Sequence, residues 1–187
     1  MSQYLPLIGV LVGGLLTFAG GFVAELVRWN RTQAVRWDER RQTAYADYAS
    51  AVKAETILYL KIANAKGVFP AQNPGIADLP ALLPLLTEAE HTRTERFAIV
   101  QLIGAAQVVD AAREWQSSVW RLGAILAPEF SGGRLHFEEL YDAATTARFE
   151  FYLKARVDLG VSSDLTPPIS LSDWTTRWSV NGSNPNP

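Results

Sequence analysis

The residues most able to bind a metal in this chain are its two histidines, each spaced three residues from a carboxylate. Glu88-x-x-His91 matches the Glu-x-x-His unit that di-iron helical bundles use, and His136-x-x-Glu139 offers a second histidine with a carboxylate. The second unit runs in the reverse order. At about 100° per residue, His91 also lies roughly 200° around a helix from Ala89, away from the apolar face. We therefore expect surface histidines, with no metal and no other cofactor.

Motifs for nucleophilic catalysis and for phosphate binding are missing from the sequence. The chain has no cysteine, no G-x-S-x-G, no P-loop and no G-x-G-x-x-G, and two histidines alone do not make a catalytic triad. Glu138 and Glu139 are adjacent, so their carboxylates diverge on a helix, and we expect a solvated helix start. The aromatic residues expected in the core are Trp115, Trp120, Phe149, Phe151 and Tyr152. The sequence predicts a protein that is not an enzyme.

A series of small residues near the N-terminus has the spacing of a membrane-helix association face. The residues that form this ridge, four apart, are Gly9, Gly13, Thr17 and Gly21. Small residues at this spacing let two helix backbones approach closely, and van der Waals packing then holds them together in lipid. Glu25 extends the series and would face Arg28 or Arg31 of a partner helix, or pair with its own Arg28. The ridge predicts self-association or binding to another membrane helix; the alternative is a lone, lipid-facing anchor.

The segment that carries this ridge is long enough to cross a bilayer. Tyr4 to Ala24 are 21 consecutive residues without a charge, and at about 1.5 Å per residue they reach roughly 30 Å. A buried core helix would normally show a polar face. A cleaved export signal would need a basic n-region, and the first three residues carry no basic side chain. We expect an uncleaved transmembrane anchor over residues 1–28.

The arginines that follow the apolar segment predict its orientation. Five of them come within about 20 residues after the segment, and no basic residue precedes it. The positive-inside rule then puts the N-terminus outside the plasma membrane and the rest of the chain in the cytoplasm, which the absence of cysteine fits. The expected membrane-interface residues are Arg28, Trp29 and Arg31. With a formal net charge of −2 the chain is not expected to bind nucleic acid, and the arginines are expected to meet the lipid bilayer.

Residues 29–160 have the pattern of an all-α, antiparallel helical bundle that continues from the transmembrane helix. No glycine or proline interrupts the chain between Gly21 and Gly67. Residues 67–75 are expected to form a turn-rich connector, in which Pro70, Pro74 and Gly75 stop the first helix. Further helices are expected over residues 79–103, ended by Gly104, and over residues 137–159, capped by Gly160. Between them a third helix is expected, whose apolar residues follow steps of four and three and form a core seam: Val108, Ala112, Trp115, Val119, Leu122 and Leu126. Residues 161–187 are expected to be a mostly irregular tail.

Three segments of the bundle region are similar to those of a known group of proteins. With the N-terminal apolar helix before them, "RWDERRQTAYADYASAV", "AAQVVDAAREW" and "FYLKARVDLGV" resemble uncharacterised single-pass membrane proteins of actinobacteria and their phages. The resemblance covers most of residues 4 to 161. It implies the single-pass topology and the helical body, and it implies no activity and no functional residue.

Two classes of function fit these features. The first is a membrane-anchored, oligomeric interaction or scaffold protein whose cytosolic bundle presents a surface to a protein partner. The second is a pore-forming or membrane-perturbing oligomer, although a single apolar helix without a polar stripe argues against an open channel. The charged residues expected to connect helices or to form an exposed partner site are Arg93, Arg96, Arg148, Arg156 and Asp158.

Overall fold

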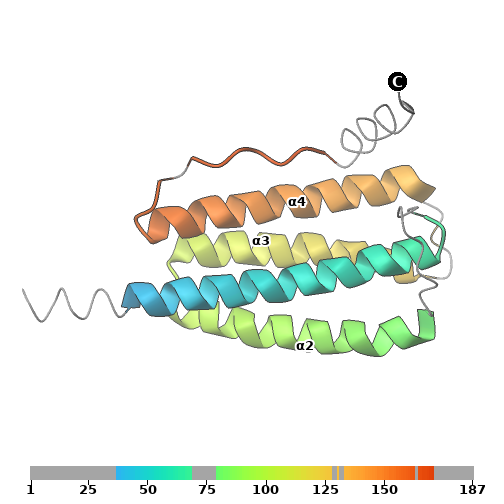
Figure 1. Ribbon diagram of the computed structural model, residues 1–187, viewed down its shortest axis with the longest axis horizontal. Coiled ribbons are helices and arrows are strands. Elements are labelled where there is room, and N and C mark those ends of the chain that lie inside the picture. Colours follow the sequence, from blue (N-terminus) through green and yellow to red (C-terminus); the bar gives the residue numbers. More distant parts are fainter. Residues whose placement is uncertain (1–36, 69–78, 128–129, 131–132, 163, 171–187) are drawn as a thin grey trace, which may run out of the picture. The chain divides into compact units, whose positions relative to one another are not determined.

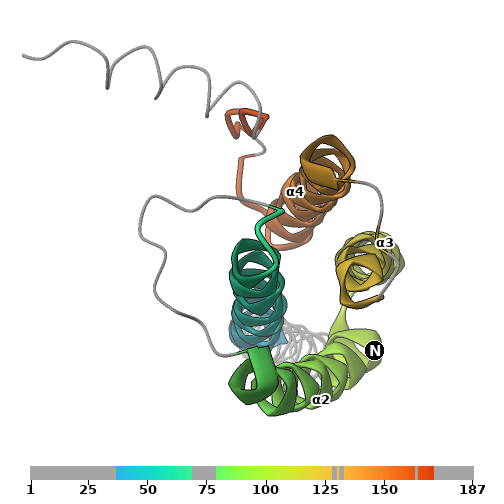
Figure 2. The same ribbon diagram turned by 90° about the vertical axis from the view of Figure 1, so that its right-hand side faces the viewer.

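The computed structural model describes residues 37–68, 79–127, 130, 133–162 and 164–170, and these residues form helices and no strand. Contacts within the chain divide it into two compact units, Met1–Arg40 and Arg41–Pro187. Neighbouring helices from residue 41 onward run in alternating directions (Figures 1 and 2). The elements are a helix over residues 37–65, α2 (Leu79–Ile103), α3 (Ala106–Leu122), the short 3₁₀ helix η1 (Gly123–Leu126) and α4 (Gly133–Asp158). The predicted all-α helical bundle is confirmed.

The helix over residues 37–65 (the 37–65 helix) turns a broad apolar stripe toward the other three helices. Its buried residues are Ala44, Tyr45, Tyr48, Ala49, Ala51, Val52, Tyr59, Ile62 and Ala63. The helix ends at Gly67, whose φ of 69° lets the Val68 N–H donate to the Ala63 carbonyl at 2.9 Å. The helix therefore ends where the predicted connector begins.

The helix boundaries around Gly104 agree with those that the sequence predicts. α2 covers the predicted residues, and Gly104 separates it from α3. On α3 and η1, every residue of the predicted seam up to Leu122 is buried, and Leu126 packs partly against the core. A seam with alternating steps of four and three keeps one stripe facing the neighbouring helices, so this pattern alone locates the core side of α3.

α4 begins earlier than predicted and ends where predicted. It starts at Gly133 rather than near Phe137, which is fully buried. At its other end Gly160 has a φ of 67°, and the Val161 N–H donates to the Arg156 carbonyl at 2.8 Å, which closes a Schellman cap. Glu138 is only 6% exposed and accepts a hydrogen bond from Arg134 Nε at 2.6 Å. The expectation that Glu138 is solvated is therefore wrong.

Aromatic rings from three helices meet at the centre of the bundle. Trp115 on α3 lies edge-on to Tyr48, with ring centroids 5.8 Å apart, and 5.4 Å from Phe151 of α4. The buried Tyr48 hydroxyl donates to the Ala112 carbonyl at 2.6 Å, so its polar atom is satisfied inside the core. Trp120 differs, because its side chain is 68% exposed. The expectation that Trp120 belongs to the core is wrong.

The predicted membrane segment lies outside the described residues. Among the described residues, which begin at residue 37, no helix is both long enough and apolar enough to cross a bilayer. The predicted span over residues 4–24 lies outside these residues, so the anchor stays a prediction. All residues predicted for helix association or for the membrane interface also lie outside the described residues: Gly9, Gly13, Thr17, Gly21, Glu25, Arg28, Trp29 and Arg31.

Candidate functional site

A buried ion pair joins the 37–65 helix to α2. Glu55 is completely buried, and its Oε2 lies 2.7 Å from Nε of Arg93, whose side chain is 8% exposed. Neither oxygen of Glu55 accepts a well-aligned hydrogen bond from the residues that the structure describes. Burial raises the pKa of Glu55 to about 7, the charge of Arg93 lowers it, and the carboxylate of Glu90 raises it. Arg93 is one of the charged residues expected to connect helices or to face a partner, and the structure places it in a connection between two helices. The sequence signal for this pair was Glu55, which interrupts an apolar series.

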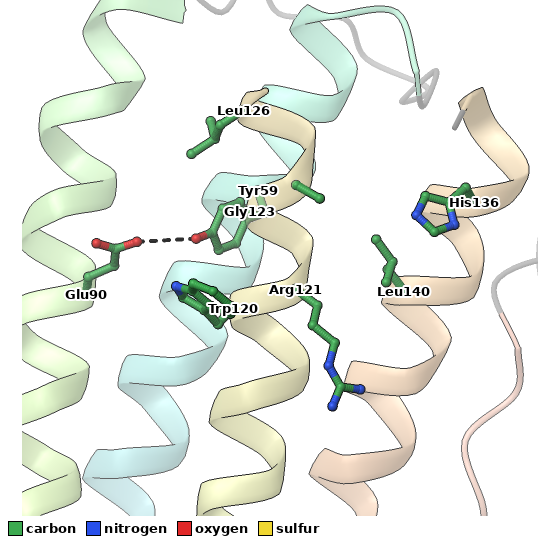
Figure 3. Close-up of a pocket in the computed structure, with 9 residues that line it drawn as sticks. Tyr59, Glu90, Trp120, Arg121, Gly123, Leu126, His136 and Leu140 are labelled. Carbon is green, nitrogen blue, oxygen red and sulfur yellow. Dashed lines mark hydrogen bonds between the residues drawn. The ribbon is translucent and has the colours of Figure 1, made fainter. Parts of the chain in front are cut away.

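Tyr59 lies one turn after Glu55 on the 37–65 helix and forms a hydrogen bond with Glu90 of α2. The Tyr59 hydroxyl donates to Glu90 Oε1 at 3.3 Å, and Figure 3 shows the two side chains pointing toward each other. Burial, together with the nearby carboxylates of Glu55 and Glu90, raises the pKa of Tyr59 above its ordinary value. A Cβ at Gly123 would lie 3.3 Å from the Tyr59 hydroxyl oxygen, so glycine allows the close approach of η1 to this ring.

Tyr59 and Glu90 form part of the wall of an open cleft of about 530 Å³. The most exposed large side chain in it is Trp120, and most of the remaining surface is apolar. In Figure 3 the lining side chains come from all four helices and η1, with Glu90 on α2 and His136 on α4. The residues that line the cleft are Tyr59, Glu90, Trp120, Arg121, Gly123, Ala124, Leu126, His136 and Leu140.

The charged side chains that line the cleft are not arranged as a catalytic nucleophile paired with a general base. His136 Nδ1 lies 3.7 Å from Glu139 of its own helix, and Arg121 lies 3.9 Å from Glu114. These groups are largely exposed, so each pair contributes little. Glu90 lies on the α2 side of this mostly apolar cleft, whereas the Arg121 side chain points toward α4 (Figure 3). The cleft is therefore suited to an apolar group that carries a cation on the Glu90 side, through contact with Trp120 and attraction to Glu90.

The two predicted Glu–His units do not come together. His91 is 69% exposed and lies 3.5 Å from Glu95, whereas His136 is 48% exposed on another helix. Among the residues placed in the structure, no three histidine or acidic side chains gather as metal ligands do.

Two more of the charged residues expected to connect helices, Arg96 and Asp158, do so. Nη1 of Arg41 lies 3.2 Å from both oxygens of Asp158, which also accepts a hydrogen bond from the Tyr45 hydroxyl at 2.7 Å. Nη1 of Arg96 lies 3.4 Å from Oδ2 of Asp47. Both connections run to the 37–65 helix, and not between α2 and α4. The reason is that the 37–65 helix neighbours both α2 and α4 in the bundle (Figure 2).

The protein is an all-α helical bundle with a buried ion pair and an open, mostly apolar cleft. Comparison of the chain with protein-family models, with curated proteins and with solved structures gave no match. The resemblance to single-pass membrane proteins therefore stays a prediction.

Proposed function

We propose that this chain is a membrane-anchored, self-associating interaction protein whose cytoplasmic helical bundle binds a protein partner. The observation that carries the proposal is the cleft around Trp120. A tryptophan side chain that is 68% exposed beside an apolar hollow leaves a large apolar area in contact with water. Tryptophan is among the residues that contribute most energy when a partner covers it. No catalytic arrangement competes with this use of the cleft among the described side chains.

The chemistry of the cleft indicates what the partner presents. An aliphatic or aromatic side chain of the partner would cover Trp120 and Leu126. A lysine or arginine beside it would face the Glu90 carboxylate, which already accepts one hydrogen bond from Tyr59. The indole ring of Trp120 favours a cation near its face as well. The partner segment is therefore expected to be apolar and basic.

The membrane part of the proposal is supported by the sequence. The uncharged stretch from Tyr4 to Ala24 has the length of a bilayer span, and the arginines after it favour a cytoplasmic bundle. The ridge from Gly9 to Gly21 favours contact between two copies of the anchor. Two bundles held at one place on the membrane would bind a partner with two sites more tightly than either bundle alone.

Site-specific photo-crosslinking tests the use of the cleft. A photoreactive residue in place of Trp120, in the full chain in its native cell, is expected to give one discrete adduct with a protein. The matched control is the same residue in place of Arg113, which is 60% exposed on α3 and lies two turns away. The Glu90→Gln variant of the position-120 probe is expected to lower the adduct yield. Equal adducts at positions 113 and 120, or none at either, would contradict the proposal.

A further inference from the structure

A second, smaller cleft of about 270 Å³ lies on a different side of the bundle. Lys53 of the 37–65 helix forms one side of it, and the residues from α4 are Thr145, Arg148, Phe149 and Tyr152. The chain after α4 turns back and runs alongside α4 (Figures 1 and 2), where Thr166 completes the wall. The cleft shares no residue with the one around Trp120.

Both charged residues that line this cleft are cations. Its lining includes Lys53 and Arg148 and no acidic side chain. Neither cation forms an ion pair with a residue that the structure describes, whereas Arg41, Arg93 and Arg96 each pair with a carboxylate. Burial raises the pKa of the Tyr152 phenol, and the nearby positive charge of Arg148 lowers it. Two cations thus share one hollow without an anion from the described part of the chain.

The uncharged part of the lining adds hydroxyl donors and flat apolar surface. Thr145 and Thr166 each bring a hydroxyl, and Phe149 and Tyr152 bring aromatic rings that are partly buried. An arginine fork and a lysine ammonium complement a doubly charged group with several acceptor oxygens. The rings offer stacking surface to an attached planar group. The small volume favours one small molecule over a polymer.

From this combination we propose that the cleft between Lys53 and Arg148 binds a small aromatic phosphate monoester. The phosphoryl group contacts Arg148 and Lys53 and accepts hydrogen bonds from the two threonines. The planar group lies against Phe149 and Tyr152. This binding is independent of the proposed protein partner, because it uses the other cleft.

Titration calorimetry of the full chain in mild detergent with phenyl phosphate tests this site. Saturable binding at one site is expected, and Arg148→Gln and Lys53→Gln are each expected to weaken it about tenfold or more, because each removes a charge-assisted contact. Matched controls are Lys154→Gln on α4 and Lys61→Gln on the 37–65 helix, both exposed and outside the cleft. The controls are expected to change the affinity less than about twofold.

Four outcomes decide against the proposal. Absence of saturable phenyl phosphate binding would overturn it, and so would equal weakening by the cleft variants and the controls. Inorganic phosphate binding as tightly as phenyl phosphate would exclude a role for the rings. Binding of short-chain phosphatidic acid without binding of phenyl phosphate would assign the cleft to a lipid headgroup instead.

Discussion

Replacing Arg93 with methionine is expected to lower the free energy of unfolding by about 3–5 kcal/mol near pH 8. The side chain of Arg93 is nearly buried and supplies the positive charge of the ion pair with the fully buried Glu55. Removing it leaves a carboxylate without a counter-charge in the core, and charge burial of this kind is costly. Urea titration of the full chain in mild detergent, followed by circular dichroism, measures the change.

The loss is expected to depend on pH. The pKa of Glu55 is raised from its ordinary value of 4.5 to about 7 in the folded chain. Between these values the folded state binds more protons than the unfolded state, so the contribution of Glu55 to stability falls as the pH rises through this interval. The charge of Arg93 lowers this pKa, and its removal raises the pKa further. The Arg93→Met variant is therefore expected to lose less stability near pH 5 than near pH 8.

A double variant separates the missing counter-charge from any loss of packing. Glu55→Leu combined with Arg93→Met replaces both partners by apolar groups, and it is expected to recover most of the stability that Arg93→Met loses. If the double variant is as unstable as the single one, the loss comes from packing. If Arg93→Met is as stable as the unchanged chain at both pH values, the ion pair contributes nothing.

Replacing Trp115 with alanine is the second change with a large expected effect, again about 3–5 kcal/mol of unfolding free energy. Trp115 is 1% exposed. It contacts the rings of Tyr48, Phe151 and Tyr152, with centroid distances of 5.8, 5.4 and 5.9 Å. Truncation removes these contacts and leaves a cavity where three helices meet. A lower urea midpoint at an unchanged slope would show the loss.

Trp120 provides the matched control on the same helix. Its side chain is 68% exposed, so Trp120→Ala is expected to change the unfolding free energy by no more than about 0.5 kcal/mol. Similar losses for the two tryptophan variants would mean that the packing of α3 differs from the one described. A small loss for Trp115→Ala alone would mean that the core closes around the cavity.

The periodic features of the bundle could be predicted from the sequence. The boundaries of α2, the buried seam of α3 and the cap at Gly160 follow from the spacing of apolar residues and from glycine at a helix end. These are local properties, because each depends on residues within one helix. The start of α4 was missed by four residues, since nothing in its first turn continues the apolar series that begins at Phe137.

The candidate sites depend on contacts between helices, which local patterns do not specify. The partner of Glu55 is 38 positions away in the chain, and the partner of Asp158 is 117 positions away. Trp120 directly follows a seam residue, and its type suggested the core while its angle on α3 exposes it. The cleft beside Lys53 needs a chain reversal after α4, which the sequence does not indicate.

The mass of the full chain in mild detergent, corrected for bound detergent, tests the central claim most directly. The claim is that the anchor assembles copies of this chain through the ridge at Gly9, Gly13, Thr17 and Gly21. The full chain and the off-ridge control Val12→Leu are expected to be oligomers, and Gly13→Leu, which places a bulky side chain on the ridge, a monomer. Monomers in all three cases, or an unchanged oligomer for Gly13→Leu, would contradict the claim.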